Sequence, residues 1–483
     1  MEEIQITKRK VITSFIWKVL EKGGAQIIQF VVSIILARML SPSDYGVLAL
    51  ITIFINLANA FVQSGFGIAL IQDKDSGDLE FSTVFYFSIV SSLLFYGILF
   101  FAAIPISKFY ETPILVNVIR VLGITLFFNS IVCIQNAFLS KRLNFKKNFI
   151  GSIGAMTLSG GIGILMAYKG FGIWALVGQN LSYSVFIFLI LCIIVKWKPK
   201  LLFSISKLKK MFSYSWKILA SNLIGTFCKN LQSLIIGKSY DTAHLGLYNR
   251  GQQFPQLVSN TLDDSIQTVL FPTFSAHNDD LEYIKRTMRK SISLSSFILL
   301  PCIFGMFAVA RPLVLTLLSA KWVDCIIFLQ ISCIGFAFLP MQTANITAIN
   351  SIGRSDIYMK LEIIKRAFTI VSLIMTAPFG IYAMAIGQAV CNILFSFINA
   401  FPNKRLLNYA YREQLEDLLP ALLISAIMSA IIMIFDRFTI FSALISLIIE
   451  ILLGIIIYVT LSLITKNKTF EFLMTTIKRK GIK

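Results

Sequence analysis

Long runs of apolar residues constrain this chain more than any other feature of its sequence. Phe81–Ile104, Leu181–Val195 and Pro420–Phe435 are three of these runs. A helix of about 20 apolar residues crosses the ~30 Å hydrocarbon core of a membrane at about 1.5 Å per residue. Hydrophobic residues make up 56% of the chain and charged residues 14%, whereas soluble domains average roughly 45–50% and about 25%. A soluble fold would leave this apolar surface without a core, so the sequence predicts an all-α polytopic membrane protein.

The apolar runs predict about fourteen spanning helices, or twelve if two weak segments merge. The predicted segments are residues 14–37, 45–71, 83–104, 114–139, 149–168, 173–195, 213–236, 250–273, 291–318, 325–349, 360–378, 381–400, 418–435 and 440–465. We expect no cleavable signal peptide, because the first strongly apolar run begins only after Glu21 and Lys22 and no small-residue cleavage site follows it.

The chain has a net charge of +20, which in a soluble protein would suggest nucleic acid as a partner. Here the Lys and Arg residues lie in short loops between apolar runs, where the positive-inside rule and anionic lipid headgroups account for them. Clusters of cations occupy one set of loops and both ends of the chain, whereas the opposite loops carry mostly single cations. The clusters are Lys8–Lys10, Lys141–Arg142, Lys146–Lys147, Lys196–Lys210, Lys285–Arg286, Arg289–Lys290, Lys404–Arg405 and Lys478–Lys480. This asymmetry predicts two cytoplasmic termini and no nucleic-acid partner.

The sequence lacks motifs for enzymatic chemistry. Its seven Cys residues form neither a CxxC pair nor a Cys/His cluster, so neither a disulfide framework nor a zinc site is supported. There is no Walker A, GxSxG or HExxH motif. Asp73-Lys74-Asp75 has the spacing of a metal-binding DxD motif, but a solvated turn is the simpler interpretation. We therefore expect no catalytic residues, no metal and no bound cofactor.

An internal repeat divides the chain. Three pairs of segments match at offsets of about 200 to 209 residues, and an even number of predicted helices separates the copies. The pairs are Trp17–Leu20 with Trp216–Leu219, Tyr45–Gly46 with Leu245–Gly246, and Phe171–Ala175 with Phe379–Ala383. The repeat is therefore parallel and predicts a six-helix N-terminal lobe (1–210), a six-helix C-terminal lobe (211–405), and two further helices with a basic cytoplasmic tail (406–483). Two like lobes with the substrate between them are typical of transporters.

Polar side chains follow single faces of helices that the repeat makes equivalent. A charge at the centre of a membrane helix costs about 2.5–3.5 kcal/mol on insertion scales, so such residues are expected to face a cavity or a partner. The first, second, seventh and eighth predicted helices carry these stripes, whereas the third and sixth are nearly free of ionisable residues. The stripe residues are Lys18, Lys22, Gln26, Gln29, Asn56, Asn59, Gln63, Asn222, Thr226, Lys229, Ser233, Gln253, Gln256, Asn260, Asp263, Asp264 and Gln267.

The stripes predict that these four helices line a hydrated central cavity. The alternative interpretation is that their amides form interhelical hydrogen bonds, each worth ~0.6 to 2 kcal/mol. Cations outnumber acids in this set, which favours an anionic cargo such as a diphosphate or acidic sugars. The cations are Lys18, Lys22, Arg120, Lys217, Lys229 and Arg250, and the acids are Glu21, Asp263 and Asp264. For Lys18, Lys217 and Arg250, which lie near helix ends, snorkelling to lipid headgroups is the alternative.

These observations define two sets of candidate site residues. Without an ATP site, net transport would require an ion gradient of H⁺ or Na⁺, and Glu21, Asp263 and Asp264 are the predicted coupling carboxylates. Glu450, an isolated carboxylate in the last predicted helix, either binds a coupling proton or packs against another helix. The predicted substrate-binding residues are Lys18, Lys22, Gln26, Gln29, Asn56, Asn59, Gln63, Arg120, Lys229, Gln256 and Asn260.

Several short motifs resemble those of one transporter family. They are Ala37–Gly46 (ARMLSPSDYG), Gln63–Gly67 (QSGFG), Ala69–Gln72 (ALIQ), Leu139–Phe145 (LSKRLNF), Phe171–Val177 (FGIWALV) and Asn350–Asp356 (NSIGRSD). In order and spacing these motifs are similar to those of polysaccharide transporters of the MOP flippase superfamily. These are the Wzx-like exporters of O-antigen, colanic acid and teichuronic acid repeat units. The resemblance spans roughly residues 10–400 and identifies the family rather than the cargo.

The resemblance implies a MATE-like fold of two pseudo-symmetric six-helix lobes plus two further helices, working by alternating access. It also implies the cargo, an undecaprenyl-diphosphate-linked oligosaccharide carried from the inner to the outer leaflet of the bacterial cytoplasmic membrane for O-antigen, capsule or exopolysaccharide synthesis. Membrane lipids, a polysaccharide polymerase and a chain-length regulator are the partners expected for such a protein.

Two alternative functions stay open at this point. A MATE-like multidrug exporter is disfavoured by the excess of cations, because a cavity for cationic drugs should be acidic instead. A membrane-bound polysaccharide polymerase or ligase would be expected to have a large extracytoplasmic loop. The longest predicted non-cytoplasmic connection, Gly237–Asn249, has only about 13 residues.

Overall fold

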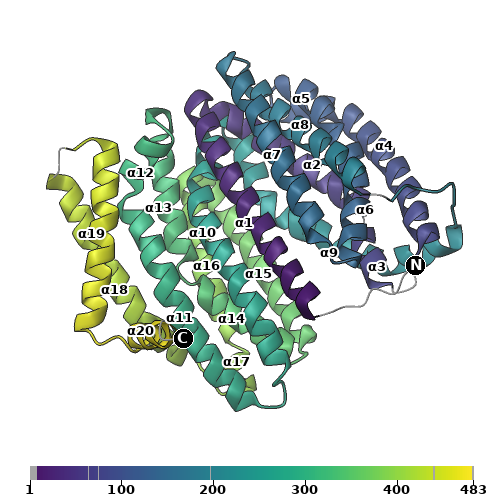
Figure 1. Cartoon of the computed structure of the whole chain (residues 1–483). Coiled ribbons are helices and arrows are strands. Elements are labelled where there is room, and N and C mark those ends of the chain that lie inside the picture. Colours follow the sequence, from purple (N-terminus) through teal and green to yellow (C-terminus); the bar gives the residue numbers. More distant parts are fainter. Residues whose placement is uncertain (1–7, 64, 74–75, 196, 439–440, 481–483) are drawn as a thin grey trace. The chain divides into compact units, whose positions relative to one another are not determined.

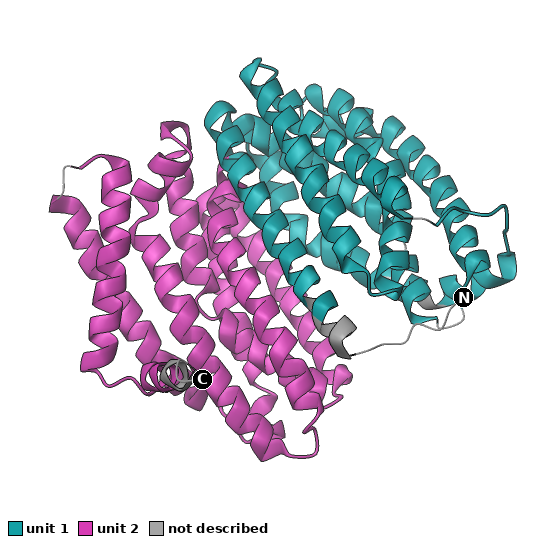
Figure 2. Cartoon of the chain, in the orientation of Figure 1, with its two compact units in different colours: residues 1–246 teal, residues 247–483 magenta. Residues whose placement is uncertain are grey.

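A computed structural model describes residues 8–63, 65–73, 76–195, 197–438 and 441–480, and these residues form helices joined by short connections. The chain divides into two compact units, residues 1–246 and 247–483, coloured separately in Figure 2. The predicted lobe boundaries at residues 210 and 405 stay predictions. Residues 74, 75 and 196, and the side chains of the predicted basic clusters at 8–10 and 478–480, lie outside the described part.

Unit 1 is built from helices α1 to α9 and the first turn of α10 (Figure 1). Their bounds are α1 Lys8–Met39, α2 Pro42–Gln63, α3 Phe66–Gln72, α4 Asp78–Phe109, α5 Ile114–Gly123, α6 Thr125–Lys141, α7 Phe145–Tyr168, α8 Ile173–Ile194, α9 Ile205–Ser239 and α10 Thr242–Ser275.

Unit 2 contains the rest of α10 and the helices that follow it, ending in α18, α19 and α20, which are yellow in Figure 1. The bounds are α11 Leu281–Ala308, α12 Ala310–Leu317, α13 Cys325–Phe336, α14 Leu339–Ser351, α15 Ser355–Thr376, α16 Ile381–Ala400, α17 Asn403–Leu406, α18 Tyr411–Phe438, α19 Ala443–Ile464 and α20 Lys468–Lys480, with 3-10 turns η1 at Ala320–Trp322 and η2 at Ala377–Phe379.

The predicted spanning segments coincide with helices or helix pairs of the described chain. Ten helical segments are long and apolar enough to cross a membrane, and the pair α13 and α14, bent by 41°, would make an eleventh. The three other predicted segments lie on α9, α10 and α15. These helices have 35, 34 and 22 residues, but α9 and α10 carry polar stripes and α15 carries Lys360, Glu362, Lys365 and Arg366. A multi-span helical membrane protein is therefore confirmed, while the number fourteen stays a prediction.

Small residues on α7 bring three helices of unit 1 close together. A Cβ atom added to Gly160 would lie 2.6 Å from Cγ2 of Val32 on α1, and one added to Gly163 would lie 2.9 Å from Cβ of Gln179 on α8. Lipid tails are as apolar as these side chains, so membrane helices associate through close van der Waals packing at small residues. Because Gly160 and Val32 hold this face of α1 against α7, the polar stripe of α1 is left on an exposed face.

The segment that joins α8 to α9 is fixed to the beginning of α4. The backbone N–H groups of Lys200 and Ser204 donate to the hydroxyls of Ser82 (3.0 Å) and Thr83 (3.1 Å). Lys207 forms a 2.8 Å ion pair with Glu80, whose side chain is buried. The last part of this connection and the first turn of α9 are thus attached to α4 within unit 1.

Unit 2 has a polar network inside an apolar core. The core surrounds α11, α14 and α18 and includes Met288, Ile292, Met341, Leu418, Ile424 and Met428. Within it, the Asn345 Oδ1 atom accepts hydrogen bonds from Asn403 (2.6 Å) and Gln414 (3.1 Å), and Asn345 Nδ2 donates to Gln414 Oε1 (2.7 Å). All three amides are fully buried or nearly so. Since a buried amide without partners costs about 1–3 kcal/mol, this network fixes how α14, α17 and α18 meet.

Candidate functional site

The polar stripe on α1 lies on an exposed face of unit 1. Lys18 forms a 3.0 Å ion pair with Glu21 one turn later, and its ammonium lies 5.5 Å from the ring of Phe145. Lys22, Gln26 and Gln29 are exposed. The Lys18–Glu21 pair joins one charge of each sign, so the net positive charge of this stripe comes from Lys22.

The polar stripe on α2 contains two exposed amides and one amide that contacts a neighbouring helix. Asn56 and Gln63 are exposed, whereas Asn59 is half-buried and accepts a hydrogen bond from Asn129 of α6 at 3.4 Å. Asn59 therefore already takes part in an interhelical contact, which is the alternative role considered for these amides. The other two have free faces on which a ligand could bind.

The two remaining predicted cations of unit 1 differ in their surroundings. Arg120 of α5 is half-buried, with its guanidinium 4.1 Å from the ring of Phe100 and Nε donating to the Phe100 carbonyl at 3.4 Å. Lys229 of α9 is exposed. A guanidinium stacked on an aromatic ring keeps other donors for an anion, because it has five N–H groups in a planar fork.

In unit 2, α10 carries the longest polar stripe. Gln256 is half-buried, and Asn260 and Asp264 are exposed. Asp263 accepts hydrogen bonds from Thr343 of α14 and from Gln267 (2.9 Å). Both donors are neutral, so these two contacts place Asp263 among uncharged polar groups.

Arg250, which we counted among the cations of the predicted cavity, is buried and packs against an aromatic side chain. Only 4% of its surface is exposed, and its guanidinium lies 5.7 Å from the ring of Trp322, which is itself fully buried. Arg250 also donates to Gln253. Its charge therefore supports the packing of α10 against η1 and neither faces an open cavity nor reaches the headgroups.

A second polar cluster in unit 2 was missed by the sequence reasoning. Arg289 of α11 binds Asp417 of α18 through Nε (2.8 Å) and Nη2 (2.9 Å), and the Tyr409 hydroxyl donates to the same carboxylate at 2.6 Å. Burial, and then the hydrogen bond to Asp417, raise the pKa of Tyr409 well above its usual range. Arg289 is 128 residues from Asp417 in the sequence, so the only available signal was a carboxylate at the edge of an apolar run.

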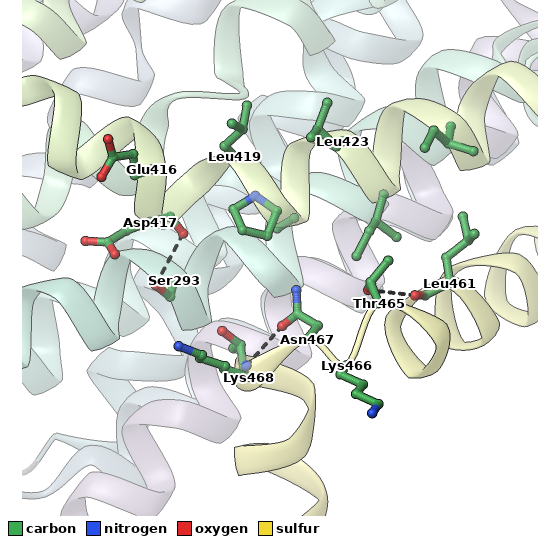
Figure 3. A pocket seen from close by; sticks show the side chains of 15 residues that line it. Ser293, Glu416, Asp417, Leu419, Leu423, Leu461, Thr465, Lys466, Asn467 and Lys468 are labelled. Carbon is green, nitrogen blue, oxygen red and sulfur yellow. Dashed lines mark hydrogen bonds between the residues drawn. The ribbon is translucent and has the colours of Figure 1, made fainter.

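The groove beside this cluster has a volume of about 680 Å³ and is lined by α18, by the turn from α19 to α20, and by Ser293 of α11. Figure 3 shows Asp417 and Ser293 at its polar end and Leu423 and Leu461 along its apolar walls. None of the predicted substrate or coupling residues lines it. The groove thus belongs to the C-terminal helices and is distinct from the polar stripes.

Comparison with known proteins matches this chain to a protein family. The profile of the family described as "Polysaccharide biosynthesis protein" matches residues 35–327. The succinoglycan biosynthesis transport protein ExoT of Rhizobium meliloti (strain 1021) is 23% identical over 353 residues, which are 73% of this chain and 72% of that protein. The teichuronic acid biosynthesis protein TuaB of Bacillus subtilis (strain 168) is 24% identical over 357 residues, 73% of each chain. The lipopolysaccharide biosynthesis protein WzxC of Escherichia coli (strain K12) is 23% identical over 412 residues, 81% of this chain and 82% of that one.

Solved structures share the fold. The lipid II flippase MurJ in an inward closed conformation superposes with a TM-score of 0.76 at 16% identity, covering 93% of this chain and 98% of MurJ. An inward-facing MATE family multidrug resistance transporter of the MOP superfamily gives 0.62 at 15% identity, covering 80% and 94%. The predicted MOP fold is confirmed. The prediction of a transporter rather than an enzyme is confirmed as well, because the related proteins of this family include a transport protein.

Proposed function

Since this chain belongs to the polysaccharide biosynthesis protein family of Wzx-like transporters, we propose that it flips undecaprenyl-diphosphate-linked oligosaccharide repeat units from the inner to the outer leaflet of the bacterial cytoplasmic membrane. The family establishes a membrane transport protein of polysaccharide biosynthesis. The lipid-linked cargo, the direction of movement and the cytoplasmic position of both termini are parts of the proposal. A polymerase and a chain-length regulator would act on the product at the outer face.

One observation carries the proposal: exposed cations and amides lie within long helices of an otherwise apolar protein. Lys22, Gln26 and Gln29 are exposed on α1, and Lys229 is exposed on α9. An ammonium or guanidinium replaces the hydration that a diphosphate loses on leaving water. Amides such as Gln26, Asn56 and Asn260 supply donors and acceptors for sugar hydroxyls.

The chemistry of the cargo assigns different roles to the charged and the neutral side chains. Lys22, Arg120 and Lys229 attract the diphosphate and acidic sugars, while the amides of the stripes hydrogen-bond the neutral sugars. The polyprenyl tail remains in the bilayer, because its transfer out of hydrocarbon would oppose binding. Alternating access then opens the loaded site first to the inner leaflet and afterwards to the outer leaflet. Asp263, Asp264 and Glu21 are the carboxylates proposed to couple this cycle to H⁺ or Na⁺.

An export assay tests the cargo assignment. In cells that depend on this chain for surface polymer, Lys22→Gln, Arg120→Gln and Lys229→Gln should each reduce polymer export. A hydrogen bond to a charged group contributes about 1.5–3 kcal/mol, so each loss should be roughly tenfold or more. Lys169→Gln is the matched control, since Lys169 is an exposed lysine in the turn between α7 and α8. Normal export by all three variants, at normal protein levels, would remove these cations from the cargo site.

A multidrug exporter is the second candidate, because a MATE transporter shares the fold. The stripes argue against it, since a cavity for cationic drugs should carry an excess of carboxylates. Expression in a drug-susceptible host should leave the inhibitory concentrations of cationic drugs unchanged. Resistance together with normal polymer levels in a deletion strain would favour the exporter instead.

A further inference from the structure

The groove between α18 and the turn from α19 to α20 combines apolar walls with a charged end. The walls are side chains of α18 and α19, namely Leu419, Leu423, Ile424, Ile427 and Leu461. Leu419, Leu423 and Ile427 are each about half exposed, at 45%, 52% and 48%. Because α18 is long and apolar enough to span a membrane, these exposed side chains meet lipid tails, and the groove opens toward the hydrocarbon.

The charged end of the groove lies where the chain leaves the membrane. Helix α19 has 22 residues and ends at Ile464, which is about the length that crosses the hydrocarbon core. The turn that follows therefore lies at the level of the lipid headgroups, and Figure 3 shows Lys466 and Lys468 beside Asn467 in this turn. Helix α20 is held against α11 by Phe470, whose ring centroid lies 6.1 Å from that of Phe297.

Two acids and two cations line the groove, and only the acids are paired. The four side chains are Glu416, Asp417, Lys466 and Lys468. Asp417 accepts two hydrogen bonds from Arg289 of α11. Glu416 forms a 3.3 Å ion pair with Arg412, one turn earlier on α18. Among the residues that the structure describes, neither lysine ammonium has an ion-pair or hydrogen-bond partner. Both lysines are therefore available to an anion.

Lys466 occupies a backbone position that favours glycine. Its φ is 47°, in the left-handed region, where a Cβ atom is unfavourable. The N–H groups of Lys466 and Asn467 donate to the carbonyls of Leu463 and Ser462, both at 3.1 Å. This is the Schellman pattern that ends many helices, and glycine is its usual residue at this place. Since glycine would form the turn more easily, the backbone does not account for a lysine here, and a role of its side chain does.

The backbone at the start of α20 does not supply the anion site. The Asn467 Oδ1 atom accepts hydrogen bonds from the N–H groups of Thr469 (2.9 Å) and Phe470 (3.2 Å), so these donors are already occupied. An anion at this end of the groove would be held by the two lysine side chains. An ammonium offers three donors and a compact charge, and both suit the oxygens of a phosphate group.

We propose that this groove binds an anionic phospholipid, such as phosphatidylglycerol. Its phosphate is held by Lys466 and Lys468, and an acyl chain lies along the wall formed by Leu423 and Leu461. The groove, with a volume of about 680 Å³, therefore takes a ligand that is apolar at one end and negative at the other. Basic pockets between membrane helices recognise anionic headgroups in the same way. The site is separate from the polar stripes and does not rest on the proposed cargo.

Native mass spectrometry of the purified full-length chain in detergent tests the proposal. With equal amounts of dioleoyl phosphatidylglycerol and dioleoyl phosphatidylcholine, the wild type should bind the anionic lipid in preference. Lys466→Gly combined with Lys468→Gln should weaken its binding by about tenfold or more, because the phosphate loses charged donors. Glycine suits the left-handed backbone at 466, so this variant keeps the turn. Lys404→Gln is the matched control, since Lys404 is an exposed lysine of unit 2 that does not line the groove.

A second variant distinguishes a lipid from a free anion. Leu423→Trp narrows the apolar wall and keeps both lysines, so it should also weaken phosphatidylglycerol binding, and soluble glycerol phosphate should not compete with the lipid. Equal binding of the two lipids by the wild type, or unchanged binding by the lysine variant, would overturn the proposal. Displacement of phosphatidylglycerol by a lower concentration of undecaprenyl diphosphate would overturn it too, because the groove would then hold a cargo lipid. The measurement requires no transport, so its failure would leave the flippase proposal standing, and failure of the export test would leave this site standing.

Discussion

The backbone of Gly46 at the start of α2 lies directly against the backbone of Gly246 in the first turn of α10. A Cβ added to Gly46 would lie 1.6 Å from the carbonyl oxygen of Thr242, and one added to Gly246 would lie 1.9 Å from that of Pro42. The contact is reciprocal, because each glycine meets the residue four positions before the other. These residues occupy the same places in the sequence repeat, which explains why glycine occurs in both copies.

The first prediction concerns this contact. Gly46→Ala and Gly246→Ala should each destabilise the protein by about 1–3 kcal/mol or more, since overpacking forces the backbones apart. The measurement is thermal unfolding of the purified protein in detergent. Gly97→Ala is the control, because no atom lies within 4 Å of a Cβ added to Gly97 in α4, and alanine favours a helix more than glycine does. Equal melting temperatures for Gly46→Ala and the wild type would contradict the close approach.

The second prediction concerns Lys141 in the motif LSKRLNF. Its ammonium donates to the backbone carbonyls of Asp73 (2.8 Å) and Ser76 (3.0 Å), so it holds the turn between α3 and α4. Lys141→Met should cost about 1.5–3 kcal/mol, because these acceptors lose a charged donor. Lys146→Met, in the same basic segment, should have a smaller effect. If the two variants unfolded at the same temperature, Lys141 would be an ordinary headgroup-facing cation.

The third prediction concerns the buried amides of unit 2. Asn345→Leu should destabilise the protein by about 1–3 kcal/mol, because the side chains of Asn403 and Gln414 would lose a buried partner. Asn350→Leu, on the same helix and only half-buried, is the matched control. Thermal unfolding compares the two. A more stable Asn345→Leu variant would mean that apolar packing of α14 outweighs its hydrogen bonds.

The fourth prediction is a pH dependence in the motif NSIGRSD. Arg354 donates two 2.9 Å hydrogen bonds to Asp356, and these bonds lower the pKa of the Asp356 carboxyl from 3.8 to about 2. A lowered pKa stabilises the folded chain above the unfolded value, and the contribution is lost as the pH falls from about 4 toward about 2. Arg354→Gln and wild type should therefore differ slightly in melting temperature at neutral pH and converge near pH 2. A difference that grows on acidification would contradict the assignment.

The apolar runs predicted where the helices lie, but they could not show where helices break. The predicted segment 45–71 is divided by Gly65, which has a φ of 70°, into α2 and α3. Segment 325–349 bends by 41° between α13 and α14. Apolar residues continue through the second break, and the first falls at the short polar stretch Gln63-Ser64-Gly65 inside an otherwise apolar run, so the length of the apolar run did not separate the helices. The backbone geometry of a few residues determines where these helices end.

The polar stripes were visible in the sequence, but the partners of individual residues were not. Asp263 binds Thr343, Arg120 stacks on Phe100 and Arg250 stacks on Trp322. Each partner lies on another element of the fold. The residue type therefore predicted that a partner or a cavity must exist, and only the packing of the helices identified these partners.

Water access to the stripes tests the central claim most directly. In a background without native cysteines, Cys would replace Gln26, Asn56 or Asn260, and a membrane-impermeant thiol reagent would be added to the cells or to inverted membrane vesicles. Ile27→Cys and Leu93→Cys are controls at exposed apolar positions. The account predicts that the three stripe cysteines react, that added lipid-linked oligosaccharide protects them, and that the controls remain unlabelled. Unreactive stripe cysteines from both sides of the membrane would show that these faces meet lipid or packed helices, and the transport site would have to lie elsewhere.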